Sequence, residues 1–126
     1  MIERLTPPGV PTPRGPYSPA VRAGDFIFVA GQVPVDPTTD KMSNGDIEHE
    51  TRLVLNNIRR IVEGAGATMA DVVRVGVYIK DGADFAAMNA VYAEFFGENK
   101  PARSTIVCGF VADIKVEIDC VVYIGQ

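Results

Sequence analysis

The segment Pro-Ala-Arg-Ser at 101–104 is the part of this chain that most constrains its fold. It follows a helical pattern and precedes two strand patterns, at 105–108 and 115–123. Because proline has a fixed φ and no N–H donor, Pro101 suits the entrance of a strand and not its interior. Arg103 is therefore expected at a strand start. A guanidinium in that place is either a solvated surface group or a rigid fork for a carboxylate or phosphate.

Strand and helix patterns alternate along the whole chain. Apolar side chains recur at helical spacing over 46–65 and again after Asp84, a favourable N-cap. The strand patterns cover 2–5, 20–22, 25–32, 71–80, 105–108 and 115–123. The strand at 26–30 is apolar on both faces, which is typical of a central strand. The order β-β-β-α-β-α-β-β predicts one α+β domain over 1–126, with both helices on one face of the sheet.

The second face of this sheet has no helix to cover it. On the strand at 71–80, four apolar residues are expected to face the helices: Val73, Val75, Val77 and Ile79. The open face is expected to carry Val72, Tyr78, Glu117, Val121 and Tyr123. A half-apolar face without cover predicts burial against other subunits, so we expect an oligomer.

Charge and hydropathy argue against several classes of protein. A net charge of −4 disfavours a nucleic-acid partner, since nucleic-acid-binding proteins normally present a basic patch. No apolar run approaches the roughly 20 residues of a membrane span. Residues 1–4 lack the apolar core of an export signal, so a cytoplasmic protein is expected. In that compartment Cys108 and Cys120 are interpreted as small buried side chains, although neighbouring strands could bring them close.

The usual catalytic sets are missing from the sequence. His49 is the only histidine, and its place beside Glu50 on a helix favours a surface residue. No Cys/His cluster has metal-ligand spacing, and no phosphate-binding loop follows the glycines at 64–66, so neither a metal nor a cofactor is expected. What remains is an arginine, a carboxylate, an amide and hydroxyls. That set suits binding of a small carboxylate, with proton transfer or attack by water.

Three side chains interrupt their local pattern, and function is expected at such interruptions. Asn89 lies at the edge of the aromatic stripe of the second helix and is either a structural amide or a ligand contact. Glu117 alternates with other charged residues on its strand, and this pattern alone favours a solvent-facing charge. Tyr17 lies in a segment with six prolines between 7 and 19. It is either a lid on the sheet or a pocket wall.

Five segments of the chain resemble the Rid (YjgF) family in order and spacing. They are Gly-Pro-Tyr-Ser at 15–18, Gly-Gln-Val-Pro at 31–34, Asn-Ala-Val-Tyr at 89–92, Pro-Ala-Arg-Ser at 101–104 and Val-Glu-Ile at 116–118. The helix at 51–66 is similar to the long first helix of that family. The resemblance covers essentially the whole chain. It implies a chorismate-mutase-like α+β fold, with two helices on one face of a mixed sheet, assembled as a homotrimer with pockets between subunits.

The resemblance also implies a function. Similar members are cofactor-independent hydrolases that deaminate 2-enamino and 2-imino acids, such as 2-iminobutanoate and 2-iminopropanoate, to 2-keto acids and ammonia. Carried over by position, Arg103 would hold the substrate carboxylate and Glu117 would position or activate water. The remaining pocket residues implied are Tyr17, Gly31, Asn89 and Thr105.

Two alternatives stay open at this point. One is a catabolic deaminase for a larger enamine acid such as 2-aminomuconate, and the other is a non-catalytic trimer that binds small carboxylates. A nuclease activity, attributed to some relatives, fits poorly with the acidic net charge.

The chain departs from the family pattern at four places. The loop Gly-Phe-Val-Ala-Asp at 109–113 replaces a segment that often contains Leu-Pro, and it is one residue shorter. Glu50 stands where Gln is common, Ala30 where Ser is common, and Thr105 where Cys is frequent. The altered loop is expected to reshape the pocket and with it the choice of substrate.

Overall fold

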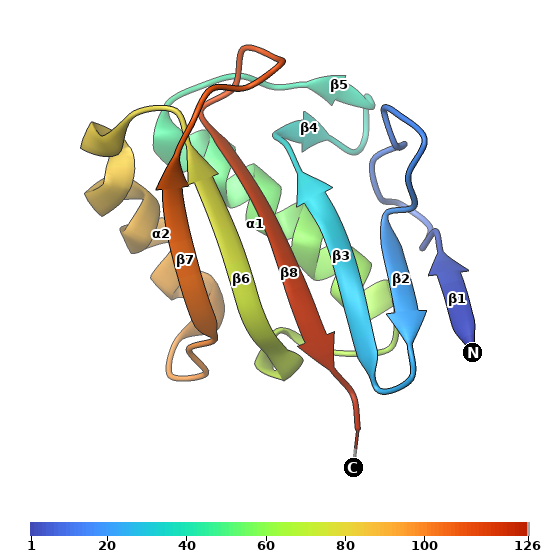
Figure 1. Cartoon of the computed structure of the whole chain (residues 1–126). Coiled ribbons are helices and arrows are strands. Elements are labelled where there is room, and N and C mark those ends of the chain that lie inside the picture. The colour runs from blue at the N-terminus through green and yellow to red at the C-terminus, as the bar shows by residue number, and fades with distance from the viewer. Residues whose placement is uncertain (126) are drawn as a thin grey trace.

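A computed structural model describes residues 1–125 of the chain. The main sheet has six strands in the spatial order β1-β2-β3-β8-β6-β7 (Figure 1). Their bounds are β1 Ile2–Leu5, β2 Ala20–Ala23, β3 Phe26–Gln32, β6 Val72–Ile79, β7 Ala102–Val107 and β8 Val116–Tyr123. A separate two-stranded ribbon is formed by β4 (Val35–Asp36) and β5 (Lys41–Met42). The helices α1 (Ile47–Gly64) and α2 (Phe85–Phe96) both cover one face of the sheet, which confirms the predicted α+β architecture.

The sheet is mixed because one of its connections is a crossover. β6 and β7 are parallel, and α2 connects them together with the short 3₁₀ turn η2 (Gly82–Asp84). Every other neighbouring pair in the main sheet is antiparallel. Parallel neighbours require such a long connection, since a tight turn reverses the chain. The crossover places α2 directly over the strand that carries Arg103.

Helix α1 has the boundaries that its sequence predicts to within a residue. Asp46 is the N-cap, and its carboxylate accepts a hydrogen bond from the backbone N–H of His49 at 2.8 Å. One side of the helix packs against the sheet and is buried; its apolar members are Ile47, Val54, Leu55, Ile58, Ile61 and Val62. This stripe fixes the rotation of α1 about its own axis.

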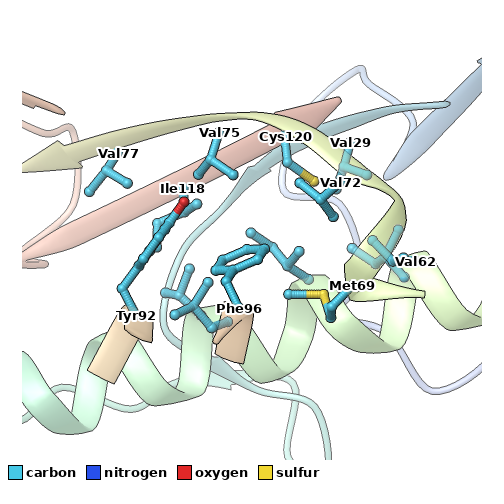
Figure 2. Close-up of a cluster of buried hydrophobic side chains, with 14 of the residues drawn as sticks. Val29, Val62, Met69, Val72, Val75, Val77, Tyr92, Phe96, Ile118 and Cys120 are labelled. Atoms are coloured by element: carbon cyan, nitrogen blue, oxygen red, sulfur yellow. The ribbon is translucent and has the colours of Figure 1, made fainter. Parts of the chain in front are cut away.

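Helix α2 contributes aromatic rings to the same core. Tyr92 and Phe96 extend from it toward Val75 and Ile118 on the sheet (Figure 2). Phe85, the first residue of the helix, is aromatic as well but is 45% exposed. Gly97 ends the helix, with a φ of 55° that favours glycine. No helix within residues 1–125 is both long enough and apolar enough to cross a membrane.

The predicted alternation along β6 is wrong at its first residues. Val75, Val77 and Ile79 face the helices as expected, but Val72 is 4% exposed and Val73 is 43% exposed, the reverse of the prediction. The pairing of β6 with β8 shifts between Val72 and Arg74. A bulge of this kind inserts one unpaired residue, so the side chains before it change face.

The other face of the sheet is open and half-apolar in the single chain. Within β3, Ile27 and Val29 are buried, whereas Phe26 and Phe28 are each more than two-fifths exposed. The ring of Phe26 lies 5.3 Å from that of Tyr123 on β8. β3 is therefore covered on one side only, although both of its faces are apolar. The expectation of an uncovered face is confirmed for the chain, and the oligomer that would cover it stays a prediction.

Neither cysteine forms a disulfide. Cys120 lies on β8 within the core, where burial raises the pKa of its thiol to about 12. Cys108 follows the end of β7 and is partly exposed. Cys120 thus behaves as a small apolar side chain, as the sequence predicts.

Candidate functional site

The residues predicted to share a site lie on two different faces of the sheet. Arg103 is the register partner of Val75 on β6, and Val75 is buried beneath the helices. Glu117 is the register partner of Tyr78, which points to the open face. Neighbouring residues of paired strands share a face. A single chain therefore keeps Arg103 and Glu117 apart.

Arg103 lies in a hollow between the end of α2 and the start of β7. This hollow, the arginine pocket, has a volume of about 280 Å³ and is lined by Asn89, Tyr92, Ala93, Phe96, Gly97, Lys100, Pro101 and Arg103. The guanidinium carbon lies 4.7 Å from the centre of the Tyr92 ring and 5.7 Å from that of Phe85. The Arg103 guanidinium takes part in none of the side-chain hydrogen bonds or ion pairs within residues 1–125, so its N–H groups are available to an anion.

Tyr92 supports Arg103 through the face of its ring. Its ring packs 4.6 Å from that of Phe96, and the hydroxyl oxygen is buried without a hydrogen-bond partner among residues 1–125. Burial raises the pKa of Tyr92, while the positive charge of Arg103 opposes that rise. The aromatic ring is thus the part of Tyr92 that the arginine pocket uses.

The sequence identified two of the polar residues of this pocket and missed two. Asn89 and Arg103 both line it, and the Asn89 amide makes none of the structural hydrogen bonds within residues 1–125 that would explain its place. Tyr92 and Lys100 were missed. The signal for Tyr92 was its position one helical turn after Asn89, whereas Lys100 has the ordinary pattern of a loop lysine.

Glu117 lies in a second and larger hollow at the other side of the sheet. This hollow, the glutamate cleft, has a volume of about 560 Å³. It is lined by Arg14, Tyr17, Ala30, Gly31, Val33, Met42, Phe110, Val111, Ala112, Ile114 and Glu117. Partial burial raises the pKa of the Glu117 carboxyl above its ordinary value, and the nearby charge of Asp119 adds to the rise. Glu117 is accordingly not the freely solvated charge that its alternation favours.

Gly31 makes room for the Glu117 carboxylate. The pairing of β3 with β8 shifts between Val29 and Gln32, which brings the Gly31 backbone against that carboxylate. A Cβ atom at position 31 would collide with the carboxylate oxygen of Glu117. Glycine is therefore the residue that permits this approach.

Tyr17 forms a wall of the glutamate cleft and is not a lid on the sheet. Its hydroxyl accepts a hydrogen bond from the backbone N–H of Arg14 at 3.1 Å. The Arg14 guanidinium in turn donates to the backbone carbonyl of Asp40 at 2.7 Å, which fixes the proline-rich segment against the β4–β5 ribbon. Sequence reasoning missed Arg14, whose only signal was its position directly before Gly-Pro-Tyr-Ser.

Glu50 is a buried carboxylate that binds the backbone next to Ile114, a residue of the cleft wall. It has no exposed surface, and its two oxygens accept hydrogen bonds from the backbone N–H groups of Lys115 at 2.7 Å and Gly45 at 3.1 Å. The Lys115 ammonium lies 3.5 Å away. Glu50 thereby joins the first turn of α1 to the start of β8, two residues before Glu117. In the sequence it appeared only as a departure from the family pattern.

Two further predicted residues line neither hollow. Thr105 lies on the same face of β7 as Arg103 but contributes to neither the arginine pocket nor the glutamate cleft. His49 is exposed, and its ring nitrogen lies 3.1 Å from the Ser43 hydroxyl. The prediction of a surface histidine is confirmed.

Comparisons with known proteins agree with this fold over nearly its whole length. Residues 9–124 match the family model described as Endoribonuclease L-PSP. A RutC family protein of Pyrococcus horikoshii is 49% identical over 98% of each chain. The crystal structure of Escherichia coli TdcF with bound serine is 36% identical, with a TM-score of 0.84 over 90% of this chain and 92% of that chain. RidA from an Antarctic Psychrobacter is 32% identical, with a TM-score of 0.91 over 97% and 99%.

Proposed function

The chain belongs to the endoribonuclease L-PSP family, the Rid (YjgF) family that its motifs resemble, and from this premise we propose that it hydrolyses 2-imino and 2-enamino acids to 2-keto acids and ammonia. One observation carries the proposal. The chain presents a guanidinium without polar partners on one face of its sheet and a half-buried carboxylate of raised pKa on the other. These are the two groups that carboxylate binding and water activation require.

A complete site would combine the arginine pocket of one subunit with the glutamate cleft of its neighbour in a homotrimer. Two observations support this assembly. Arg103 and Glu117 lie on opposite faces of one sheet, so they meet only if two chains contribute. The open face that carries Glu117 is also half-apolar, and farther along its strands Phe26, Phe28 and Tyr123 are exposed in the single chain.

The chemistry follows from the two groups. Arg103 donates two parallel hydrogen bonds to the α-carboxylate of the imino acid. Glu117 accepts a proton from a water molecule whose oxygen bonds to the imine carbon. Glu117 returns this proton to the imine nitrogen, which takes up the electrons of the C=N π bond, and a carbinolamine forms. Glu117 then carries the hydroxyl proton of the carbinolamine to the nitrogen, the carbon–nitrogen bond breaks, ammonia leaves and the carbonyl of the 2-keto acid remains. Burial and Asp119 raise the pKa of Glu117, which brings this base closer to neutral pH.

A relative with a bound ligand supports the substrate class. Escherichia coli TdcF was crystallised with serine, which has an α-carboxylate and an α-nitrogen as 2-imino acids do. The family description also includes endoribonuclease activity. The net charge of −4 disfavours that activity here, because RNA backbones bind through neutralisation of their phosphates.

A coupled assay tests the proposal. An amino-acid oxidase generates the imino acid, and release of the 2-keto acid is followed with and without this protein. We expect the wild-type chain to accelerate release and Arg103→Ala to abolish the acceleration. Arg103→Lys should recover little, since one ammonium cannot replace a planar fork. The loss of such a charge-assisted pair is about 1.5–3 kcal/mol, roughly ten- to hundredfold in affinity.

The variant Glu117→Gln distinguishes an enzyme from a protein that only binds carboxylates. It retains shape and hydrogen bonding but cannot accept a proton, so turnover should fall by about 10²–10⁴-fold. Its affinity for 2-oxobutanoate, measured by calorimetry, should stay near that of the wild type. If the wild type binds the keto acid but does not accelerate hydrolysis of the imino acid, the protein is a carboxylate-binding trimer. Cleavage of RNA that survives in both variants would instead favour the nuclease.

A further inference from the structure

The glutamate cleft is apolar almost throughout. Arg14 and Glu117 are its only charged lining residues. Most of the remaining wall is aliphatic or aromatic, from Ala30, Val33, Met42, Phe110, Val111, Ala112 and Ile114. A ligand that enters the cleft therefore meets a polar group at Glu117 and mostly hydrocarbon away from Glu117, Arg14 and Tyr17.

The outer wall of the cleft consists of three consecutive apolar residues in a loop. Phe110, Val111 and Ala112 lie between Gly109 and Asp113, and Val111 is fully exposed. The loop is tied at both ends. The Cys108 N–H donates to the Ile79 carbonyl at 2.9 Å, and the Asn44 side chain donates to the Asp113 carbonyl. Val111 is thus held beside the cleft without cover from the described residues 1–125, and Phe110 is half-buried.

Arg14 is not free to bind a second acidic group. Its guanidinium donates to the backbone carbonyls of Asp40 at 2.7 Å and Thr12 at 3.4 Å, and it lies 4.0 Å from the Asp40 carboxylate. Its charge is already partly neutralised by that carboxylate. A substrate with a terminal carboxylate would find no uncommitted cation on this wall.

We infer that the glutamate cleft binds the side chain of the substrate, and that this chain prefers 2-imino acids with longer aliphatic side chains over 2-iminopropanoate. The inference rests on the proposed function, in which Arg103 takes the carboxylate and Glu117 serves the reacting carbon. The side chain is then the substituent left for the cleft. The volume of about 560 Å³ lies within the range usual for small-molecule sites, roughly 300–1,000 Å³.

The experiment measures kcat/KM for a series of 2-imino acids, generated by an amino-acid oxidase from alanine, 2-aminobutyrate, norvaline, leucine and glutamate. We expect kcat/KM to rise about fourfold with each added methylene from alanine to norvaline, with leucine at least as good. The imino acid from glutamate should be among the poorest substrates. Equal kcat/KM values across the aliphatic series, or a higher kcat/KM for the imino acid made from glutamate, would overturn the inference.

Matched variants locate the preference in the cleft. Val111→Thr replaces one methyl group by a hydroxyl at a fully exposed position, so it should leave the fold intact. We expect Val111→Thr to lower kcat/KM for the imino acid made from leucine at least threefold more than for the imino acid made from alanine. Phe110→Ala should have the same effect more strongly. Val73→Thr, exposed on the β6 bulge outside the cleft, is the control and should change neither value. Equal losses on both substrates in the Val111 and Phe110 variants would contradict a side-chain site.

Failure of the proposed function gives a different result. If no imino acid is turned over, the deaminase proposal is wrong, and calorimetry with pyruvate, 2-oxobutanoate and 4-methyl-2-oxopentanoate then tests the cleft alone. Affinity that increases with the size of the side chain, and that is lower in Val111→Thr than in the wild type, supports the cleft as a side-chain site. Affinity independent of the side chain excludes it.

Discussion

Arg103 is held by aromatic rings, and this leaves its polar edge free. A ring face attracts a guanidinium by about 0.5–1 kcal/mol at exposed sites and by about 2 kcal/mol when it is desolvated. Tyr92 and Phe85 provide such faces at 4.7 and 5.7 Å. A carboxylate partner in their place would have consumed the donors that the substrate needs. Tyr92 is thus a positioning residue that acts through Arg103.

Two substitutions of Tyr92 separate its ring from its hydroxyl. Tyr92→Phe keeps the ring and removes an unpaired buried hydroxyl, so KM should stay unchanged and the midpoint of thermal unfolding should stay equal or rise. Tyr92→Leu removes the ring face and should raise KM several-fold with little change in kcat. Steady-state kinetics and calorimetry measure both effects. A Leu variant with wild-type KM would show that Arg103 is positioned without the ring.

Glu117 should make the stability of the protein depend on pH. Because burial raises its pKa in the folded state, its contribution is fully present at low pH and is lost as pH rises through the folded pKa. Glu117→Gln cannot ionise. The free energy of unfolding of the Gln variant, relative to that of the wild type, should therefore increase between about pH 4 and pH 7. Urea denaturation at both pH values measures the difference, with exposed Glu63→Gln as the control. A gain equal to that of the control would contradict the assigned burial.

At the scale of elements, the register of β6 decides which side chains reach which face. The parallel pair β6–β7 places Arg103 beside Val75, and the antiparallel pair β6–β8 places Glu117 beside Tyr78. Val75 and Tyr78 are an odd number of positions apart, so they point to opposite faces. The separation of the two functional groups is thus a property of strand pairing and not of any loop.

Glu50 is predicted to hold α1, the preceding loop and β8 together. Glu50→Ala would leave the partly buried N–H groups of Gly45 and Lys115 without this acceptor, at up to about 1–3 kcal/mol for each unsatisfied group. Glu50→Gln keeps the size and one strong acceptor, so its loss should be smaller. Thermal unfolding measures both, and exposed Glu48→Ala on the same helical turn should change little. An Ala variant as stable as the Glu48 control would show that water satisfies these groups.

At the scale of the whole molecule, neither half of the proposed site is complete by itself. The arginine pocket has donors but no carboxylate, and the glutamate cleft has a carboxylate but no free guanidinium. The open face of the sheet, which carries Glu117, exposes aromatic side chains that a second subunit would cover. Assembly and activity are therefore expected to be lost together on dilution.

Mixed assemblies test this directly. Arg103→Ala and Glu117→Gln should each be inactive alone, but after unfolding and refolding together a site with Arg103 from one chain and Glu117 from another becomes possible. In randomly mixed trimers, about a quarter of the sites should be intact. The coupled assay should thus recover roughly a quarter of wild-type activity, and light scattering should report a trimer. A mixture as inactive as its components would place both residues of a site in one chain.

Much of the architecture could be predicted from the sequence because local physics determines it. The periods of 3.6 and 2 defined both helices and most strands, while Asp46, Gly97 and Pro101 marked element boundaries through capping and backbone restriction. Arg103, Asn89 and Glu117 were identifiable because they interrupt an expected pattern or match a family motif.

Tertiary structure alone decided the rest. The bulge that exchanges Val72 and Val73 arises from pairing with β8, which is distant in sequence. Glu50 accepts N–H groups from residues 5 and 65 positions away, and the stacking of Arg103 on Tyr92 depends on the crossover through α2. Such contacts leave no local periodicity, because each one depends on which segments the folded chain brings together. The opposite faces of Arg103 and Glu117 were invisible for the same reason, since parity along one strand says nothing about its register with the next.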